Sequence, residues 1–204
     1  MVSRSTPLNQ ALQKQPEKPR VTPLDVFDRA RTLWLSGERL NLGSLAEEMG
    51  VSRATLFRWV GNKELLLGEI LWSSYQPLVD KAVSQSEGKG VDFMVDVFRQ
   101  MNLLIMKSEP LRHFISQDPA YALRVLTSKD STIHARVVSL NTDLLQQQIK
   151  ERRIKPPLSV ESLSYFMVRL GESCIYSEMI SGIKPDARQL EEACIAIRIL
   201  LGGK

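Results

Sequence analysis

One short stretch of the chain gathers the polar and basic side chains best suited to chemistry. Ser52, Arg53, Thr55 and Arg58 fall within seven positions, so a helix would place them on its first turn and outer face. Hydroxyl and guanidinium groups in that position can donate hydrogen bonds to base edges and phosphates in the major groove of DNA. The residue types therefore indicate contact with nucleic acid.

Two short helices joined by a glycine-containing turn would position these side chains. Apolar spacing predicts helices over 42–49 and 53–60, and Gly50 permits the unusual backbone angle of the turn between them. Val51 and Leu56 can fill the wedge where the helices cross. This is helix-turn-helix spacing. Three-helix cores without any role in DNA binding share the pattern, so the spacing alone leaves that alternative open.

The rest of the sequence predicts amphipathic helices and no strands. In the first of them Leu24, Phe27, Ala30, Arg31 and Trp34 recur at helical spacing. The expected helices cover residues 23–36, 63–83, 93–105, 111–116, 121–126, 133–150, 159–181 and 186–201. Thr22, Ser52 and Asn62 are expected N-caps. We therefore expect an all-α fold with three parts, namely a flexible basic arm over 1–20, a helix-turn-helix domain over 21–68 and a helical domain over 69–204.

Positive charge is concentrated at the N-terminal end. The first 63 residues hold 10 basic and 6 acidic side chains, which leaves 17 of the 27 basic and 17 of the 23 acidic ones for the rest. The net charge of +4 therefore belongs to the N-terminal third, and an excess of this kind favours a polyanionic partner.

Composition argues against a membrane protein and against a secreted one. No apolar run approaches the roughly 20 residues that cross a bilayer, and the N-terminus lacks the apolar stretch of a signal peptide. Cys174 and Cys194 fit a reducing compartment. We expect a cytoplasmic protein without membrane contact.

The sequence offers no arrangement typical of an enzyme. His113 and His134 are the two histidines, and neither lies in a motif that supplies a base to a nucleophile. The histidines and cysteines show none of the usual metal-ligand spacings, and no glycine-rich phosphate loop occurs. We predict a protein that is not an enzyme and that has neither metal nor cofactor.

Residues 51–66, V-S-R-A-T-L-F-R-W-V-G-N-K-E-L-L, resemble the DNA-binding domain of TetR-family repressors. The resemblance extends from about Thr22 to Leu67. It implies that Lys63 meets a phosphate at the start of the fourth helix. The DNA-contacting residues that it implies are Ser52, Arg53, Thr55, Phe57, Arg58, Trp59 and Lys63.

Two positions depart from the family pattern. Phe57 stands where a phosphate-binding tyrosine is usual, so one hydroxyl contact is missing. Trp59 stands where histidine or tyrosine is commoner. Its indole can stack on a sugar or bind a phosphate, and packing against the first helix is the alternative.

The resemblance also implies that the C-terminal domain binds a small effector and pairs into a homodimer through its last two long helices. Two apolar stripes could form that interface, and burial inside one monomer is the alternative. The stripes are Leu163, Phe166, Met167, Leu170 and Cys174, and Leu190, Ala193, Cys194, Ile197 and Leu201. Gly171 and Ser177 would leave room for close helix approach on a neighbouring face.

An effector pocket needs apolar walls with a few polar groups. The candidates are Phe93, Phe98, Met101, Ile105, Phe114, Tyr165, Phe166 and Met179, with His134 and Arg169 as polar anchors. Ordinary core packing is the alternative for the apolar ones, and pairing with Glu172 or Glu178 is the alternative for Arg169. The C-terminal part resembles regulators that control degradation of lactone quorum signals.

We therefore expect a repressor that a small apolar effector, a lipid, lactone or aromatic molecule, releases from a palindromic operator in double-stranded DNA. The competing hypothesis is a helical protein-interaction module that uses the helix-turn-helix as scaffold.

Overall fold

A computed structural model describes residues 21–128, 132–151, 153–181 and 187–203, with the side chains of 178–181 left out. Its helices are α2 (Pro23–Leu35), α3 (Leu42–Glu48), α4 (Arg53–Val60), α5 (Lys63–Gln85), α6 (Val91–Met106), α7 (Glu109–Gln117), α8 (Pro119–Thr127), α9 (Thr132–Lys150), α10 (Val160–Ser181) and α11 (Ala187–Leu200). No strand occurs in these ranges, and the all-α prediction is confirmed. The predicted basic arm, 1–20, lies outside the described residues.

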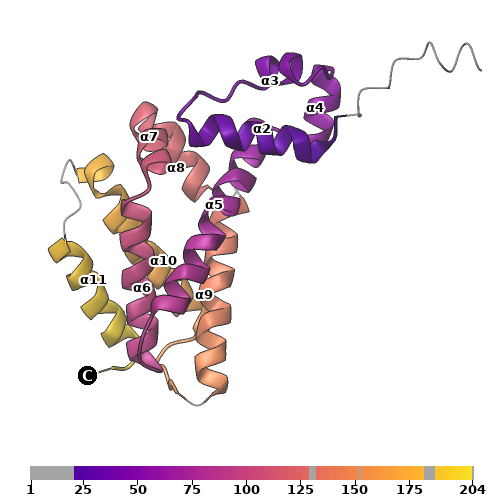
Figure 1. Ribbon diagram of the computed structural model, residues 1–204. Helices are drawn as coiled ribbons and strands as arrows, with labels where there is room; N and C mark the ends of the chain where they lie inside the picture. Colours follow the sequence, from indigo (N-terminus) through magenta and orange to yellow (C-terminus); the bar gives the residue numbers. More distant parts are fainter. Residues whose placement is uncertain (1–20, 129–131, 152, 182–186, 204) are drawn as a thin grey trace, which may run out of the picture.

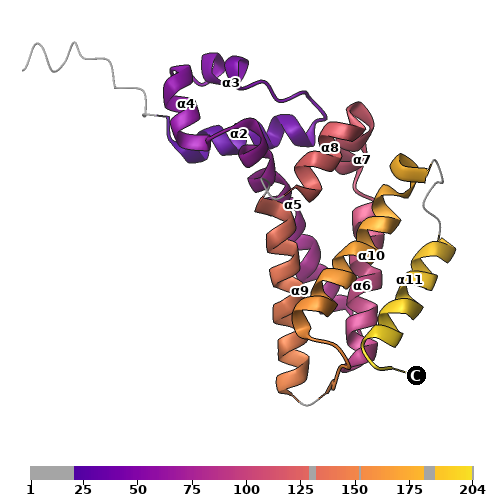
Figure 2. The ribbon, with the colours of Figure 1, turned by 180° about the vertical axis from the view of Figure 1, so that it is seen from behind.

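The helices form a small N-terminal unit set on the end of a larger bundle. Helices α2, α3 and α4 lie together at one end, and α5 runs from them into the bundle beside α6, α9 and α10 (Figures 1 and 2). Helix α11 lies against α6 at the bundle's edge, while α7 and α8 lie between the bundle and α2. Helix α5 is therefore the continuous link between the two parts.

Polar caps fix where the N-terminal helices begin. The Oγ of Ser52 accepts a hydrogen bond from the backbone N–H of Thr55 at 3.0 Å, and Asn62 Oδ1 accepts one from Leu65 at 2.7 Å. Thr22 forms a capping box with Asp25, and the hydrogen bonds from Thr22 hold the pKa of the Asp25 carboxyl below its usual range. All three predicted caps are confirmed.

One apolar core joins the N-terminal unit to the bundle. Val26, Ala30 and Leu56 are fully buried in it, and so is Ile70, beyond the predicted domain boundary at residue 68. Helices α8, α9 and α10 add residues to the same cluster. Leu24, which helical spacing assigned to the apolar face, is exposed, because α2 turns Val26 inward instead.

A second core corrects the expectation for the dimer interface. Leu163, Met167 and Cys174 of α10 are buried among α6, α9 and α11 of the same chain. The predicted stripe of α11, namely Leu190, Ala193, Cys194, Ile197 and Leu201, is buried in the same cluster. These buried residues therefore stabilise the monomer, which is the alternative that the sequence left open, whereas Phe166 of the first stripe is exposed.

Gly90 occupies a position that no other residue fits. It precedes α6 with φ of +62°, and its N–H donates to Gln148 Oε1 at 3.1 Å. A β-carbon there would collide with the backbone carbonyl oxygen of Arg153. Gly50 also has a positive φ, +65°, but open space surrounds the position of its β-carbon.

These two glycines give a matched stability test. We predict that Gly90→Ala lowers the free energy of unfolding by about 2 to 3 kcal/mol, because backbone strain and collision act together. Gly50→Ala should lower it by about 1 kcal/mol through backbone strain alone. Urea denaturation measures both values, and equal losses would contradict the collision.

Candidate functional site

Helices α3 and α4 form a helix-turn-helix pair whose crossing is tightly packed. Ala46 and Leu56 are buried where the helices meet, and the N–H of Val51 donates to the carbonyl of Ala46 at 3.0 Å. Gly50 supplies the left-handed conformation in the turn. The outer face of α4 is consequently held in a fixed orientation on the N-terminal unit.

The cationic side chains of α4 project away from the protein. The side chain of Arg53 is 72% exposed and lies 3.8 Å from Glu47 Oε1, a loose contact in solvent. Arg58 is exposed too and makes no ion pair with any residue in the described ranges. Thr55 is half-buried, with its hydroxyl 2.9 Å from that of the cap residue Ser52. A recognition helix requires this display of donors.

The two aromatic residues of α4 differ in their surroundings. Phe57 is 46% exposed and offers an apolar surface with no hydrogen-bonding group. Trp59 is half-buried and packs against the core that contains α2, which agrees with the packing alternative. Much of its indole surface is therefore committed to the fold.

Lys63 lies at the first position of α5, where it contacts the bundle. Its Nζ is 5.1 Å from the ring centroid of Tyr121 in α8, and Arg124 is also 5.1 Å from that centroid. Burial raises the pKa of the Tyr121 hydroxyl. Lys63 thus connects the end of the helix-turn-helix to α8.

The charge excess lies mostly outside the described residues. Residues 1–20 carry 4 of the 10 basic and 1 of the 6 acidic groups of the N-terminal third, which leaves 6 basic and 5 acidic for 21–63. The N-terminal unit itself is therefore nearly neutral. Any DNA contact in it depends on a few placed cations rather than on overall charge.

A cavity of about 450 Å³ lies inside the bundle between α5, α6, α9 and α10, with α2 at one end. Phe98, Met101, Ile105 and His134, four of the predicted pocket residues, line it. The apolar lining includes Leu78, Val97, Leu140 and Leu144 as well. A space of this size and character suits a small, mostly apolar ligand.

The other pocket candidates lie elsewhere in the structure. Tyr165, Phe166 and Arg169 are exposed on α10, because that helix turns Met167 and its neighbours inward instead. Phe114 packs edge-on against Trp34, with ring centroids 6.3 Å apart, in a second and smaller cavity beneath α2. Phe93 belongs to the apolar clusters beside the cavity. The side chain of Met179 lies outside the described ones.

Gly171 also faces inward. A β-carbon at this position would lie 3.2 Å from Asn102 Oδ1 and 3.5 Å from Phe98. Gly171 therefore allows close packing of α10 on α6, so the helix that approaches it belongs to the same chain. Ser177, the other small residue singled out on this helix, is buried as well.

One carboxylate lines the cavity, and it already has partners. Glu172 accepts a hydrogen bond from Arg169 Nη1 at 2.7 Å, and its Oε1 is 3.1 Å from His134 Nδ1. Arg169 thus makes one of the internal pairings left open by the sequence. The one carboxylate of the lining is therefore already paired with the Arg169 guanidinium and the His134 ring.

Sequence reasoning missed several cavity residues from helices far apart in the chain. Arg31 and Trp34 come from α2, and Tyr75, Asn102 and Tyr176 come from α5, α6 and α10. Arg31 carried one usable signal, since it shares helical spacing with apolar residues. A charged side chain on the apolar face of a helix points into the protein interior or lies at its border.

The histidine, cysteine and acidic side chains of the described residues show neither a metal-binding cluster nor an activated thiol at Cys194. The described part of the chain contains no group of three or more histidine, cysteine or acidic residues placed to hold a metal ion. Burial raises the pKa of the Cys194 thiol to about 11, so this thiol stays protonated at neutral pH. None of the described helices combines the length and apolarity needed to cross a bilayer.

Comparison with known proteins agrees with this geometry. Residues 89–201, more than half of the chain, match the family model of the tetracyclin repressor-like C-terminal domain. The chain belongs to the TetR family of transcriptional regulators. No curated protein compared with the chain matches it significantly.

Two solved structures illustrate the similarity. The R. erythropolis repressor QsdR is 30% identical, with a TM-score of 0.81 over 89% of this chain and 95% of its own. FadR from Bacillus subtilis, solved with stearoyl-CoA, is 12% identical, with a TM-score of 0.53 over 90% of this chain and 100% of its own. Likeness to FadR shows the shared fold alone.

Proposed function

We propose that this TetR-family regulator is a homodimeric repressor that leaves a near-palindromic operator when a small molecule fills the bundle cavity. The observation that carries the proposal is the free display of Arg53 and Arg58 on α4, which α5 joins to the cavity wall. In this view residues 21–68 contact DNA in the cytoplasm, and 69–204 bind the effector and form the dimer.

In this proposal the first turn of α4 enters the major groove. Arg53 and Arg58 read base edges, whereas Ser52, Thr55 and Lys63 position the helix on phosphates. Phe57 and the exposed edge of Trp59 contribute apolar contact with the sugar-phosphate backbone. The arm, 1–20, carries three of the four net positive charges and strengthens binding without selecting sequence.

The proposed dimer face consists of exposed apolar residues on α10 and α11. Ile195 is 58% exposed and Ile199 is 65% exposed, one turn apart on α11, and Phe166 is exposed on α10. Large apolar side chains in such a group are typical of an interface. A two-fold axis there would place the two α4 helices of the dimer on two half-sites. The half-sites would be about 34 to 36 Å apart, or a multiple of this distance.

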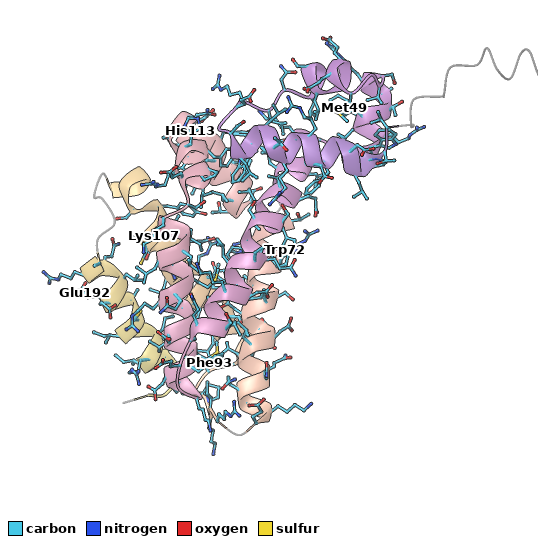
Figure 3. All side chains as sticks on the ribbon, viewed as in Figure 1. Met49, Trp72, Phe93, Lys107, His113 and Glu192 are labelled. Atoms are coloured by element: carbon cyan, nitrogen blue, oxygen red, sulfur yellow. The ribbon has the colours of Figure 1, made fainter. Side chains whose placement is uncertain are left out.

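Polar contacts beside the second cavity support coupling between the effector domain and α2. Gln117 Nε2 donates to the Gly37 carbonyl at 3.1 Å and lies 2.7 Å from His113 Nε2. His113, on α7 next to α2, places its own Nε2 2.9 Å from the same carbonyl (Figure 3). A movement of α7 would therefore be transmitted through the Gly37 carbonyl to the C-terminal end of α2.

Removing the hydrogen bond from Gln117 to Gly37 should weaken this coupling. We predict that Gln117→Ala leaves operator affinity within about threefold but reduces the effector's influence on it by about 0.5 to 2 kcal/mol, or 2- to 30-fold. Operator titrations with and without effector measure the coupling. An unchanged effector response would show that Gln117 does not transmit the signal. Ser116→Ala, whose hydroxyl bonds only to its own helix, is the control.

Salt dependence separates this function from the interaction-module hypothesis. A protein that neutralises several phosphates loses about 10³- to 10⁵-fold in affinity between 50 and 200 mM salt, because counterions are released on binding. Apolar docking of helices would barely respond. Fluorescence anisotropy with labelled duplex DNA tests this directly, and a flat salt response would favour the module.

A further inference from the structure

One end of the cavity carries hydrogen-bond donors that have no anionic partner among the described residues. Arg31 of α2 lines it half-buried, and its Nε donates to Ser73 Oγ at 3.2 Å. Arg31 has no ion pair with any carboxylate in the described ranges. A partly buried guanidinium without a counter-charge is unfavourable in the empty protein and well placed to receive an anion.

A second unpartnered donor lies one turn along the same helix. Trp34 is only 5% exposed and lines both this cavity and the second one, and its Nε1 has no hydrogen-bond partner among the described residues. An indole N–H can only donate, so an oxygen acceptor would satisfy it. Lys107, at the end of α6 nearer α7, adds another cation to the cavity wall (Figure 3).

No comparable charge is free elsewhere in the lining. Glu172 is already paired with Arg169 and His134. Asn102 is uncharged: its Nδ2 donates to the carbonyl of Phe98 at 2.8 Å, and its Oδ1, beside Gly171, has no hydrogen-bond partner among the described residues. The remaining wall between α5, α6 and α9 is mostly apolar. The cavity thus has one cationic end beside α2 and one apolar body.

We infer that the effector is an anionic amphiphile. Its carboxylate binds Arg31 and the Trp34 N–H at the α2 end, while its hydrocarbon body fills the space between α5, α6 and α9. This inference rests on the proposed function and adds the chemical class of the effector. Because Arg31 and Trp34 belong to the N-terminal unit, the carboxylate of the ligand would contact α2 directly. Filling of the cavity would thereby be coupled to the position of the helix-turn-helix.

Three ten-carbon probes with different heads test the charge preference. Calorimetric titration of the full chain at pH 8, without DNA, would compare decanoate, decan-1-ol and decylammonium. We expect decanoate to bind at least 10-fold more tightly than decan-1-ol, and decylammonium to bind most weakly. Equal or tighter binding of decan-1-ol, or no binding of any probe, would overturn the inference.

Two arginine variants locate the head group. Arg31→Gln should lower decanoate affinity about 10-fold or more and change decan-1-ol affinity less than threefold. Arg29→Gln is the matched control, since Arg29 lies on the same helix but pairs with Glu48 outside the cavity. The assignment would be contradicted if both variants lowered decanoate affinity equally, or if Arg31→Gln lowered the affinities for decanoate and decan-1-ol equally.

These titrations separate the two claims. If the protein prefers decanoate through Arg31 but binds no duplex DNA, the proposed function is contradicted and the inference about the effector stands. If the protein binds an operator but does not distinguish decanoate from decan-1-ol, the proposed function stands and the inference about the effector is contradicted.

Discussion

Replacing Arg53 or Arg58 with alanine should weaken binding to the operator by about 5- to 150-fold each, or 1 to 3 kcal/mol, and relax base preference. The reason is geometric. Both guanidinium groups lie on the exposed face of α4 without a strong partner, so in the complex each can make two hydrogen bonds to one guanine. Binding to the operator and to single-base variants would be compared by gel shift.

Two further variants give this experiment its controls. Lys63→Ala should weaken all sequences alike, because a phosphate contact carries no sequence information. Arg112→Ala removes an exposed arginine from α7 and should change neither affinity nor preference. A Lys63→Ala variant with altered base preference, or Arg53→Ala and Arg58→Ala variants that behave like the parent, would contradict the assigned division of labour.

Two glutamates on α11 should separate the subunits. In Ile195→Glu/Ile199→Glu, four added carboxylates would face each other across a two-fold axis in an apolar interface, where neither water nor a cation offsets them. We expect a folded monomer and a loss of about 100-fold or more on a two-half-site operator, because linked binding of two readers is lost. Sedimentation and gel shift measure the two effects.

The matched control places the same change on another helix. Ala135 and Ser139 are exposed one turn apart on α9, at the opposite edge of the bundle from α11 (Figures 1 and 2). Ala135→Glu/Ser139→Glu should remain dimeric and bind DNA as before. If both double variants stay dimeric, the interface does not include the exposed face of α11.

Local signals made the N-terminal unit predictable. Caps at Thr22, Ser52 and Asn62 and the glycine of the turn act within a few residues, so the sequence places the helix starts closely. The exposed position of Arg53 followed from its place just after a cap. Trp59 was harder to place, since its indole can face either the core or the solvent at the same helical position.

The cavity and the dimer face depend on helix rotation, which spacing alone does not determine. Phe166 and Met167 are adjacent apolar residues, yet one is exposed and the other is buried beside the cavity. Both faces of α10 and α11 carry apolar residues, so the sequence could not say which face meets the same chain. The helical spacing of Arg31 with apolar residues hinted that it faces inward, but the cavity that it lines is formed with α5, α6 and α9, which are distant in the chain, so no local pattern predicts the cavity.

Selection of bound duplexes from a random-sequence pool tests the role of α4 most directly. The full chain should enrich a near-palindrome with half-sites about one helical turn, or a multiple of one turn, apart. The Arg53→Ala/Arg58→Ala variant, selected in parallel, should fail to enrich that sequence. Enrichment of no palindrome by the parent protein, or of the same palindrome by the variant, would contradict the claim that α4 reads an operator.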